Sequence, residues 1–231
     1  MRTIHVRLLS LATFALLTVS ANAAAQSKSP AILSGLEVQQ LISRNATVDH
    51  ARLAVHFKVL ADNYTAEAKR HASMAQPVGN PGRNVTTTVS GHCKQLEELN
   101  TQSATAVREL AVHYQMLAAG QASVAPPDSA GFQAGAGARQ PTDQELSGLA
   151  ESAHTSAAHQ ELAAYFLALA KRYTTDVSNH TAFAKAYRGL PRGSNIAMAA
   201  HCDHVAALSH EAAKEASAAA AIHEDLAGAV R

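Results

Sequence analysis

The chain has 231 residues, of which 47% are hydrophobic but only 4% are aromatic, and it contains no tryptophan. Its 19 basic and 18 acidic side chains nearly cancel, so there is no basic excess to neutralise phosphates and nucleic-acid binding is not expected. Alanine is abundant and β-branched residues show no alternating runs, which argues against a β-sandwich and predicts closely packed helices.

Residues 1–23 have the pattern of a secretory signal peptide. Arg2 and Arg7 supply a short basic lead, and the run at 8–19 is almost entirely apolar before small residues end the segment. This run is shorter than the roughly 20 residues that a membrane-spanning helix needs. We therefore expect a secreted or periplasmic protein with no membrane span in its mature form.

Each half of the remaining chain opens with a capping-box pattern, in which a hydroxyl side chain caps a helix and a glutamate three residues later reaches back. The two pairs are Ser34 with Glu37 and Thr142 with Glu145. They predict two short lead-in helices, the first of which ends near Ser43.

Four long helices are predicted by apolar residues at alternating steps of three and four, and by the prolines and glycines that interrupt this pattern. Thr47 and Ser156 are the expected N-caps of the first and third helices. The segment 120–141, rich in Ala, Gly, Pro and Ser, is predicted to be a flexible linker. The four helices are expected at about 48–74, 87–119, 157–187 and 195–229.

The two halves carry the same residue types at an offset of 109 positions, which indicates an internal duplication. We expect an all-α fold, an antiparallel four-helix bundle made of two duplicated helical hairpins within 34–119 and 142–231, each preceded by its short lead-in helix. The matched residues are His50 and His159, Phe57 and Phe166, Tyr64 and Tyr173, Glu67 and Asp176, His71 and His180, His92 and His201, and Cys93 and Cys202.

The closed ends of the hairpins are expected to gather histidines and acids. In the first and third long helices an acid stands four residues before a histidine, so it can bind a metal itself or orient the imidazole that does. Such a set suits iron, manganese, zinc or Cu(II), and the first hypothesis is binding of a transition-metal ion for storage, sequestration or redox chemistry. The predicted ligands are Glu67, His71, His92, Asp176, His180 and His201.

A second hypothesis needs no cofactor. The same side chains would then form a hydrated layer of acid–imidazole pairs in a disulfide-stapled structural or interaction module. Non-covalent haem between two opposed histidines is the less favoured cofactor, because aromatic residues are few. No motif of a hydrolase or a nucleotide-binding protein is found, and the sequence names no enzymatic reaction.

The remaining histidines of the mature chain divide into two groups. His50, His113 and His159 are expected at the open ends of the hairpins, where they form an alternative second site. Glu215 falls opposite Phe166 in the expected register, and nothing in the sequence explains an acid there. Five histidines are expected at the surface: His56, His154, His204, His210 and His223.

Two packings of the hairpins are compatible with the linker. With closed ends together, all six predicted ligands form one site and Cys93 lies level with Cys202, so that an exported chain can oxidise them to a disulfide. Soft metal ligands and buried free thiols are the other roles open to these cysteines. We favour the packing with closed ends together, because a cysteine present in both halves is most simply explained by a disulfide between the two. Head-to-tail packing would instead give two smaller sites, one from Glu67, His71, His92 and His159 and one from Asp176, His180, His201, His50 and His113.

Overall fold

The computed structural model describes residues 32–76, 84–120, 141–151, 153–191 and 195–229. The predicted signal peptide and nearly all of the predicted linker lie outside these residues. The described part of the chain contains helices and irregular segments but no strand, which confirms the all-helical prediction.

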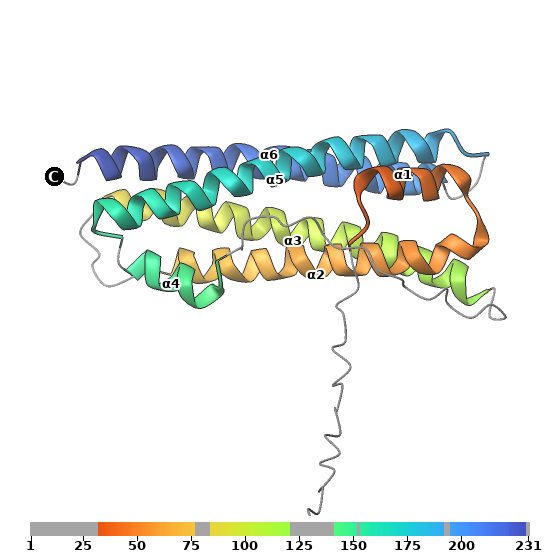
Figure 1. Ribbon diagram of the computed structural model, residues 1–231, viewed down its shortest axis with the longest axis horizontal. Helices are drawn as coiled ribbons and strands as arrows, with labels where there is room; N and C mark the ends of the chain where they lie inside the picture. Colours follow the sequence, from red (N-terminus) through yellow and green to blue (C-terminus); the bar gives the residue numbers. More distant parts are fainter. Residues whose placement is uncertain (1–31, 77–83, 121–140, 152, 192–194, 230–231) are drawn as a thin grey trace, which may run out of the picture.

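Within the described residues six α-helices pack against one another, and a 3-10 turn precedes the second of them (Figure 1). The four long helices begin and end within three residues of their predicted bounds. The two short ones, α1 and α4, are the predicted lead-in helices. In chain order the elements are α1 (Gly35–Arg44), η1 (Thr47–Asp49), α2 (His50–Ala75), α3 (Asn84–Ala119), α4 (Asp143–Glu151), α5 (Ser156–Arg188) and α6 (Asn195–Ala229).

Local capping explains where the short helices begin. Ser34 Oγ accepts from the backbone N–H of Glu37 at 3.3 Å, and Glu37 Oε2 accepts from the N–H of Ser34 at 2.9 Å, so the predicted capping box is formed. The same contacts join Thr142 and Glu145 at 3.2 and 2.7 Å. α1 stops at Asn45, whose φ of 48° lies in the left-handed region common at helix C-termini.

The predicted N-caps of the first and third long helices are wrong. Thr47 begins the 3-10 turn, and α2 follows with no side-chain cap. α5 is capped by Thr155, whose hydroxyl accepts from the N–H of Ala158 at 3.2 Å. Ser156 instead donates to the carbonyl of Ala227 at 2.8 Å, which ties the start of α5 to the end of α6.

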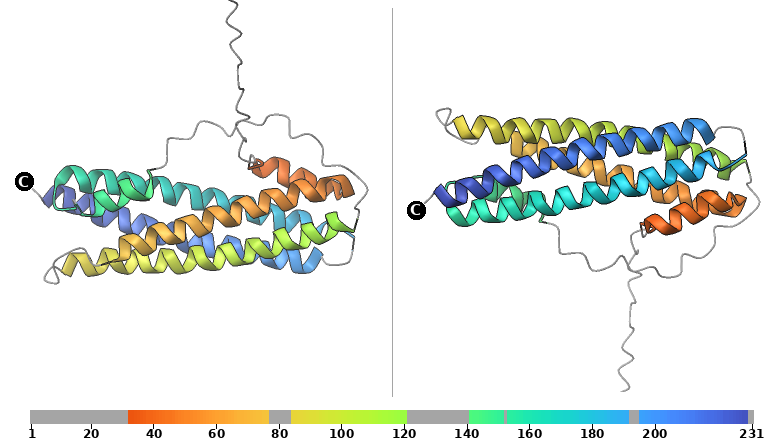
Figure 2. Two further views of the ribbon diagram at one scale, coloured as in Figure 1. Left: turned by 90° about the horizontal axis from the view of Figure 1, so that it is seen from below. Right: turned by 90° about the horizontal axis from the view of Figure 1, so that it is seen from above.

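The long helices form two antiparallel pairs, α2 with α3 and α5 with α6, and α3 also packs along α6. The C-terminal end of α2 and the N-terminal end of α3 lie at one end of the molecule, whereas the C-terminal end of α5 and the N-terminal end of α6 lie at the other (Figure 2). The pairs are therefore packed head to tail, and the favoured packing with closed ends together is wrong. Contacts on both sides of the centre fit this orientation, since Phe57 of α2 meets Phe183 of α5 with centroids 6.4 Å apart and His71 of α2 meets Phe166 of α5 at 6.1 Å.

Both short helices reach across to the other half of the chain. α1 lies against α5, and α4 lies against α2 as well as α5 (Figure 1). The approach of α1 is close at Gly35, where a Cβ atom would collide with the side chain of Asn179. A larger residue at position 35 would require the side chain of Asn179 to move.

The helix face predicted from the 109-residue repeat lies in the core. Phe57 and Phe166 are at most 1% exposed, and the matched tyrosines and histidines of this face are buried with them. Leu60 is only partly buried. Alanine supplies many of the other buried side chains, which lets the helices approach closely. Among the described helices, none combines the length and the apolar character that crossing a membrane requires.

Candidate functional site

The structure divides the six predicted metal ligands among separate places. The two acids lie near the middle of the molecule between α2 and α5. His71 and His180 lie in the core toward opposite ends, since each is near the C-terminal end of one of two antiparallel helices. Within the described residues, no group of three or more histidine, cysteine, aspartate or glutamate side chains is arranged to hold a metal ion. The single combined site of the favoured packing is therefore not assembled.

Glu67 is a buried carboxylate whose oxygens already accept from protein donors. Oε1 accepts from Arg172 at 3.2 Å and from Arg70, and Oε2 accepts from the hydroxyl of Tyr165 at 3.1 Å. Burial alone would raise the pKa of Glu67, but the two guanidinium groups outweigh it and lower that pKa below its ordinary value. Glu67 is thus an ionised group that joins α2 to α5, and in this arrangement it is engaged by cations of the protein itself.

Asp176 occupies the matching position in a different environment. It accepts from the hydroxyl of Tyr64 at 2.9 Å, yet burial raises its pKa to about 6 against the opposing effects of that bond and of Arg172. One turn away on α5, the hydroxyl of Tyr173 accepts from the side-chain amide of Asn100 at 2.6 Å. These contacts link α2, α3 and α5 and hold the two helix pairs in register.

His71 and His180 are neutral core residues. Both are at most 1% exposed, and within the described structure neither ring nitrogen of His71 nor Nδ1 of His180 has a hydrogen-bond partner. Nε2 of His71 lies 3.8 Å from Oε2 of Glu67, and its ring stacks on Phe166 with centroids 6.1 Å apart. Burial lowers the pKa to about 4 for His71 and to about 3 for His180. Both pack as uncharged aromatic side chains.

His92 and His201 each face a glutamate across the α3–α6 interface. Nδ1 of His92 lies 2.6 Å from Oε2 of Glu215, and Nδ1 of His201 lies 3.0 Å from Oε2 of Glu109. The first contact explains Glu215, for which the sequence offered no role. The His92 contact has the geometry of a hydrogen bond, whereas the His201 contact is an ion-pair approach of the two atoms. A carboxylate that accepts from Nδ1–H favours the tautomer that leaves the lone pair of Nε2 for a metal.

His201 opens onto a surface groove of about 580 Å³ between α3 and α6. His204, which is exposed as predicted, lines the same groove from three residues farther along α6, so both imidazoles lie on one helix face. The His-x-x-His spacing is a sequence signal for this groove, but the contact to Glu109 has none because it depends on how the helix pairs pack. The groove is lined by Thr101, Gln102, Thr105, Ala106, Glu109, Ala197, Ala200, His201 and His204.

The alternative second site is also divided. His159 lies with His223 where α5 begins and α6 ends, and the Nδ1 atoms of these two rings are 3.0 Å apart. His50 and His113 lie toward the opposite end of the molecule. Burial, together with the neighbouring His50 and His201, lowers the pKa of His113.

Two histidines that were expected at the surface are buried. His56 is 4% exposed, and its Nδ1 accepts from the backbone N–H of Leu33 at 3.2 Å. His223 is 3% exposed and stacks on Phe166 with centroids 5.7 Å apart. Burial lowers the pKa of each to about 4. The segment before α1 covers His56, and α5 covers His223. The periodicity of a single helix does not predict either contact. The surface prediction is confirmed for His154, His204 and His210.

The predicted disulfide is wrong, because Cys93 and Cys202 are free, buried thiols. Cys93 adjoins His92, which contacts Glu215, and Glu215 lies 13 residues along α6 from Cys202. That separation is about 20 Å along a helix, whereas a disulfide needs Cα atoms within about 7 Å. Burial raises the pKa of each thiol to about 12, so neither is a thiolate ligand as it stands.

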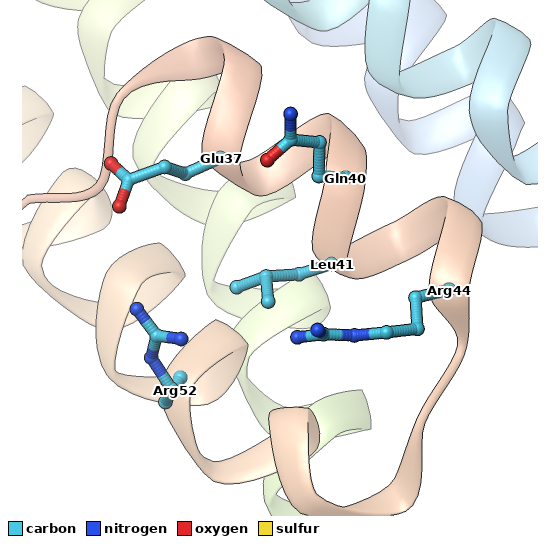
Figure 3. A pocket seen from close by; sticks show the side chains of 5 residues that line it. All are labelled: Glu37, Gln40, Leu41, Arg44 and Arg52. Atoms are coloured by element: carbon cyan, nitrogen blue, oxygen red, sulfur yellow. The ribbon is translucent and has the colours of Figure 1, made fainter.

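A second surface pocket of about 410 Å³ lies between α1 and the start of α2 (Figure 3). Its residues form no motif in the sequence, because the pocket exists only once α1 folds back toward α2. It is lined by Glu37, Gln40, Leu41, Arg44 and Arg52.

No protein-family model, curated protein or solved structure matches this chain.

Proposed function

We propose that the chain binds a divalent transition-metal ion in the groove between α3 and α6, with the imidazoles of His201 and His204 as ligands. The observation that carries this proposal is the contact between Nδ1 of His201 and Oε2 of Glu109 at 3.0 Å. Metal-binding histidines almost always donate their second ring N–H to a carboxylate, a carbonyl or water, which fixes the tautomer and makes the other nitrogen more basic, and Glu109 lies within reach of Nδ1 for this role.

The ligand set favours particular metals. Imidazoles suit Cu(II) and Zn(II), whereas manganese prefers carboxylate and water ligands. Side chains at positions i and i+3 are neighbours on a helix surface, so both rings can reach one ion. Two protein ligands leave other coordination positions to water or to a ligand that arrives with the metal. Such a site exchanges its ion readily, which suits transfer of the metal.

The proposal includes the finer architecture predicted from the sequence, an antiparallel four-helix bundle built from two duplicated hairpins. Matched ring contacts support it. Phe57 stacks on Tyr114 with centroids 5.8 Å apart, and Phe166 stacks on His223 at 5.7 Å. Both members of the second contact stand 109 residues after those of the first.

Export through the segment 1–23 is likewise part of the proposal, and its support is the sequence pattern. Amino-terminal sequencing of protein recovered from outside the cytoplasm tests it. The expected first residue follows the run of small residues that ends this segment. A chain that still begins at Met1 would contradict export by this route.

A cofactor-free structural or interaction module is the second candidate. The observation that favours it is the buried carboxylate of Glu67, which is bound by Arg70, Arg172 and Tyr165. In this case the polar groups at the centre hold the helix pairs together without a metal, and no disulfide contributes.

Calorimetric titration of metal-free mature protein with Cu(II) or Zn(II) separates the two candidates. The wild type is expected to bind one ion at micromolar concentration, and the double variant His201→Ala, His204→Ala is expected to lose this binding. His210→Ala is the matched control, because His210 is an exposed histidine of the same helix outside the groove. No binding by the wild type, or equal binding by the double variant, would overturn the metal proposal. Loss of binding in folded His71→Ala would move the site to the core.

A further inference from the structure

The pocket between α1 and α2 brings two arginine side chains together. Arg44 comes from the last turn of α1 and Arg52 from the first turn of α2. Figure 3 shows their guanidinium groups entering from opposite sides, with the side chain of Leu41 between them. Like charges that converge on one cavity repel each other. An anion held between them relieves that repulsion.

Arg44 is held in position by the protein. Its Nε lies 2.8 Å from Oδ2 of Asp49 and its Nη2 lies 2.9 Å from Oδ1, a two-point contact that fixes the planar group. Asp49 is itself only 3% exposed. The contact occupies one edge of the guanidinium, and within the described residues Nη1 makes no hydrogen bond. Arg44 therefore presents further donors from a fixed position.

Arg52 forms no ion pair with Glu37 in the described structure, although the pKa of that carboxyl is lowered first by the Ser34 contacts and then, to a smaller extent, by the nearby positive charge of Arg52. The acid on the pocket wall, Glu37, is committed to the cap of α1, where its Oε2 accepts from the N–H of Ser34 at 2.9 Å and from the Ser34 hydroxyl at 2.8 Å. Across the part of the chain that the structure describes, the guanidinium of Arg52 forms neither an ion pair nor a hydrogen bond. Its donors are available to a ligand.

We propose that this pocket binds the oxyanion of a small organic acid or of phosphate, with Arg44 and Arg52 as its charged donors. Guanidinium groups match the oxygens of carboxylates and phosphates in both charge and geometry. Gln40 lines the same pocket and adds a neutral amide donor. The side chain of Leu41, 5% exposed, supplies an apolar surface for the carbon skeleton of an organic acid. The site uses none of the residues of the metal groove.

The test is a titration of the full mature protein with inorganic phosphate and, separately, with propionate, in a chloride-free buffer. Saturable binding of at least one anion is expected. Arg52→Gln is expected to weaken it by about tenfold or more, because a charge-assisted hydrogen bond is lost. Lys58→Gln is the matched control, since Lys58 is an exposed cation of the same helix that pairs with Asp62 at 2.7 Å outside the pocket.

Each outcome decides a separate point. Tighter binding of phosphate than of propionate assigns the pocket to phosphate groups, and the reverse order assigns it to organic acids. The proposal fails if neither anion binds at millimolar concentration, or if Arg52→Gln and Lys58→Gln weaken binding equally, since overall charge would then be the cause. Removing bound metal with a chelator that is dialysed away before the titration leaves the expected result unchanged, so this test is independent of the metal proposal.

Discussion

Two histidine–glutamate pairs at the α3–α6 interface match in position and differ in surroundings. Nδ1 of His92 lies 2.6 Å from Glu215, and Nδ1 of His201 lies 3.0 Å from Glu109. The two histidines are 109 residues apart, and each pair joins one helix pair to the other. The contact between imidazole and carboxylate is thus a packing element common to both places.

The difference lies in what surrounds each pair. Three residues after His201 stands His204, whereas the same position in the first half is Gln95. The side chain of Glu109 is 55% exposed and that of Glu215 is 31% exposed. We infer that the second imidazole is what turns the shared contact into a candidate metal site. One metal site is therefore expected in the wild type. It can be tested by substitutions beside the His201 pair and beside the His92 pair.

Acid is expected to unfold the core of the protein, and both histidine–glutamate pairs are then lost together. The pKa of buried His71 is about 4 and that of buried His180 about 3, compared with an ordinary value of 6.5. Because the unfolded chain binds these protons more tightly, stability is fully present above pH 6.5 and falls as the pH drops toward 4. Each histidine contributes up to about 1.4 kcal/mol per pH unit in that range.

Urea unfolding followed by circular dichroism from pH 7.5 to 4.5 measures this loss. The folded chain binds the proton of Asp176 more tightly than the unfolded chain, since its pKa is raised to about 6, so this one group acts in the opposite direction. His71→Phe, which can stack on Phe166 without titrating, should flatten the pH dependence. An unfolding midpoint that is constant between pH 7 and pH 5 would show that the buried histidines do not limit stability.

Converting each pair into the other is expected to move the metal site. His204→Gln gives the His201 pair the surroundings of the His92 pair and should weaken Cu(II) or Zn(II) binding more than the tenfold to hundredfold typical of outer-shell changes. Calorimetry with His210→Ala as the control measures the loss. Unchanged affinity in folded His204→Gln would remove His204 from the site.

The reverse exchange, Gln95→His, is expected to create a second site beside His92. The bound metal should rise from one ion to two per chain, because the new imidazole lies on the same helix turn as an oriented one. Metal content after equilibrium dialysis reports the stoichiometry. A stoichiometry that stays at one would mean that the open groove, and not the second imidazole, makes the difference.

Removing the orienting carboxylate is expected to have a smaller effect. Glu109→Gln retains a side chain of the same shape but favours the Nδ1–H tautomer of His201 less, and should weaken metal binding by about tenfold. Glu215→Gln is the matched control at the other pair and should leave metal binding unchanged. Equal losses in the two variants would indicate a general effect of surface charge.

The smallest expected effect is that of Glu215→Gln on stability. His92 and Glu215 are both partly exposed, so their contact resembles a surface ion pair and is expected to contribute within about 1 kcal/mol to the free energy of unfolding. Glu67→Gln, which removes a buried charge that binds the partly buried guanidinium groups of Arg70 and Arg172, should cost several kcal/mol by comparison. Similar unfolding midpoints for the two variants would contradict this ranking.

The helices and their capping boxes were predictable from sequence because they depend on residues that are close together in the chain. The helix bounds follow from apolar spacing and from the breakers between helices, and the capping boxes at Ser34 and Thr142 involve residues three apart. The packing of the two pairs was not predictable, since a linker of about 20 residues can span the molecule in either orientation. Retention of Cys93 and Cys202 pointed to the wrong orientation, because both serve as buried apolar side chains.

The candidate site was predictable only in part. His201 was singled out by its repeat, and its neighbour His204 was assigned to the surface, where it is. Glu109 could not be found, because its contact with His201 joins helices far apart in sequence. The burial of His56 and His223 arises in the same way, from chain segments that periodicity within one helix does not describe.

The position of α1 on α5 affects the order in which the molecule can be completed during synthesis. α1 is made first, but the surface against which Gly35 meets Asn179 is made only after α2, α3 and α4. Until then the apolar face of α1, with Val38 and Ile42, has no α5 to cover it. A nascent chain that carries only the first half therefore exposes an apolar surface that can associate with other chains. We expect it to need protection from aggregation until α5 is complete.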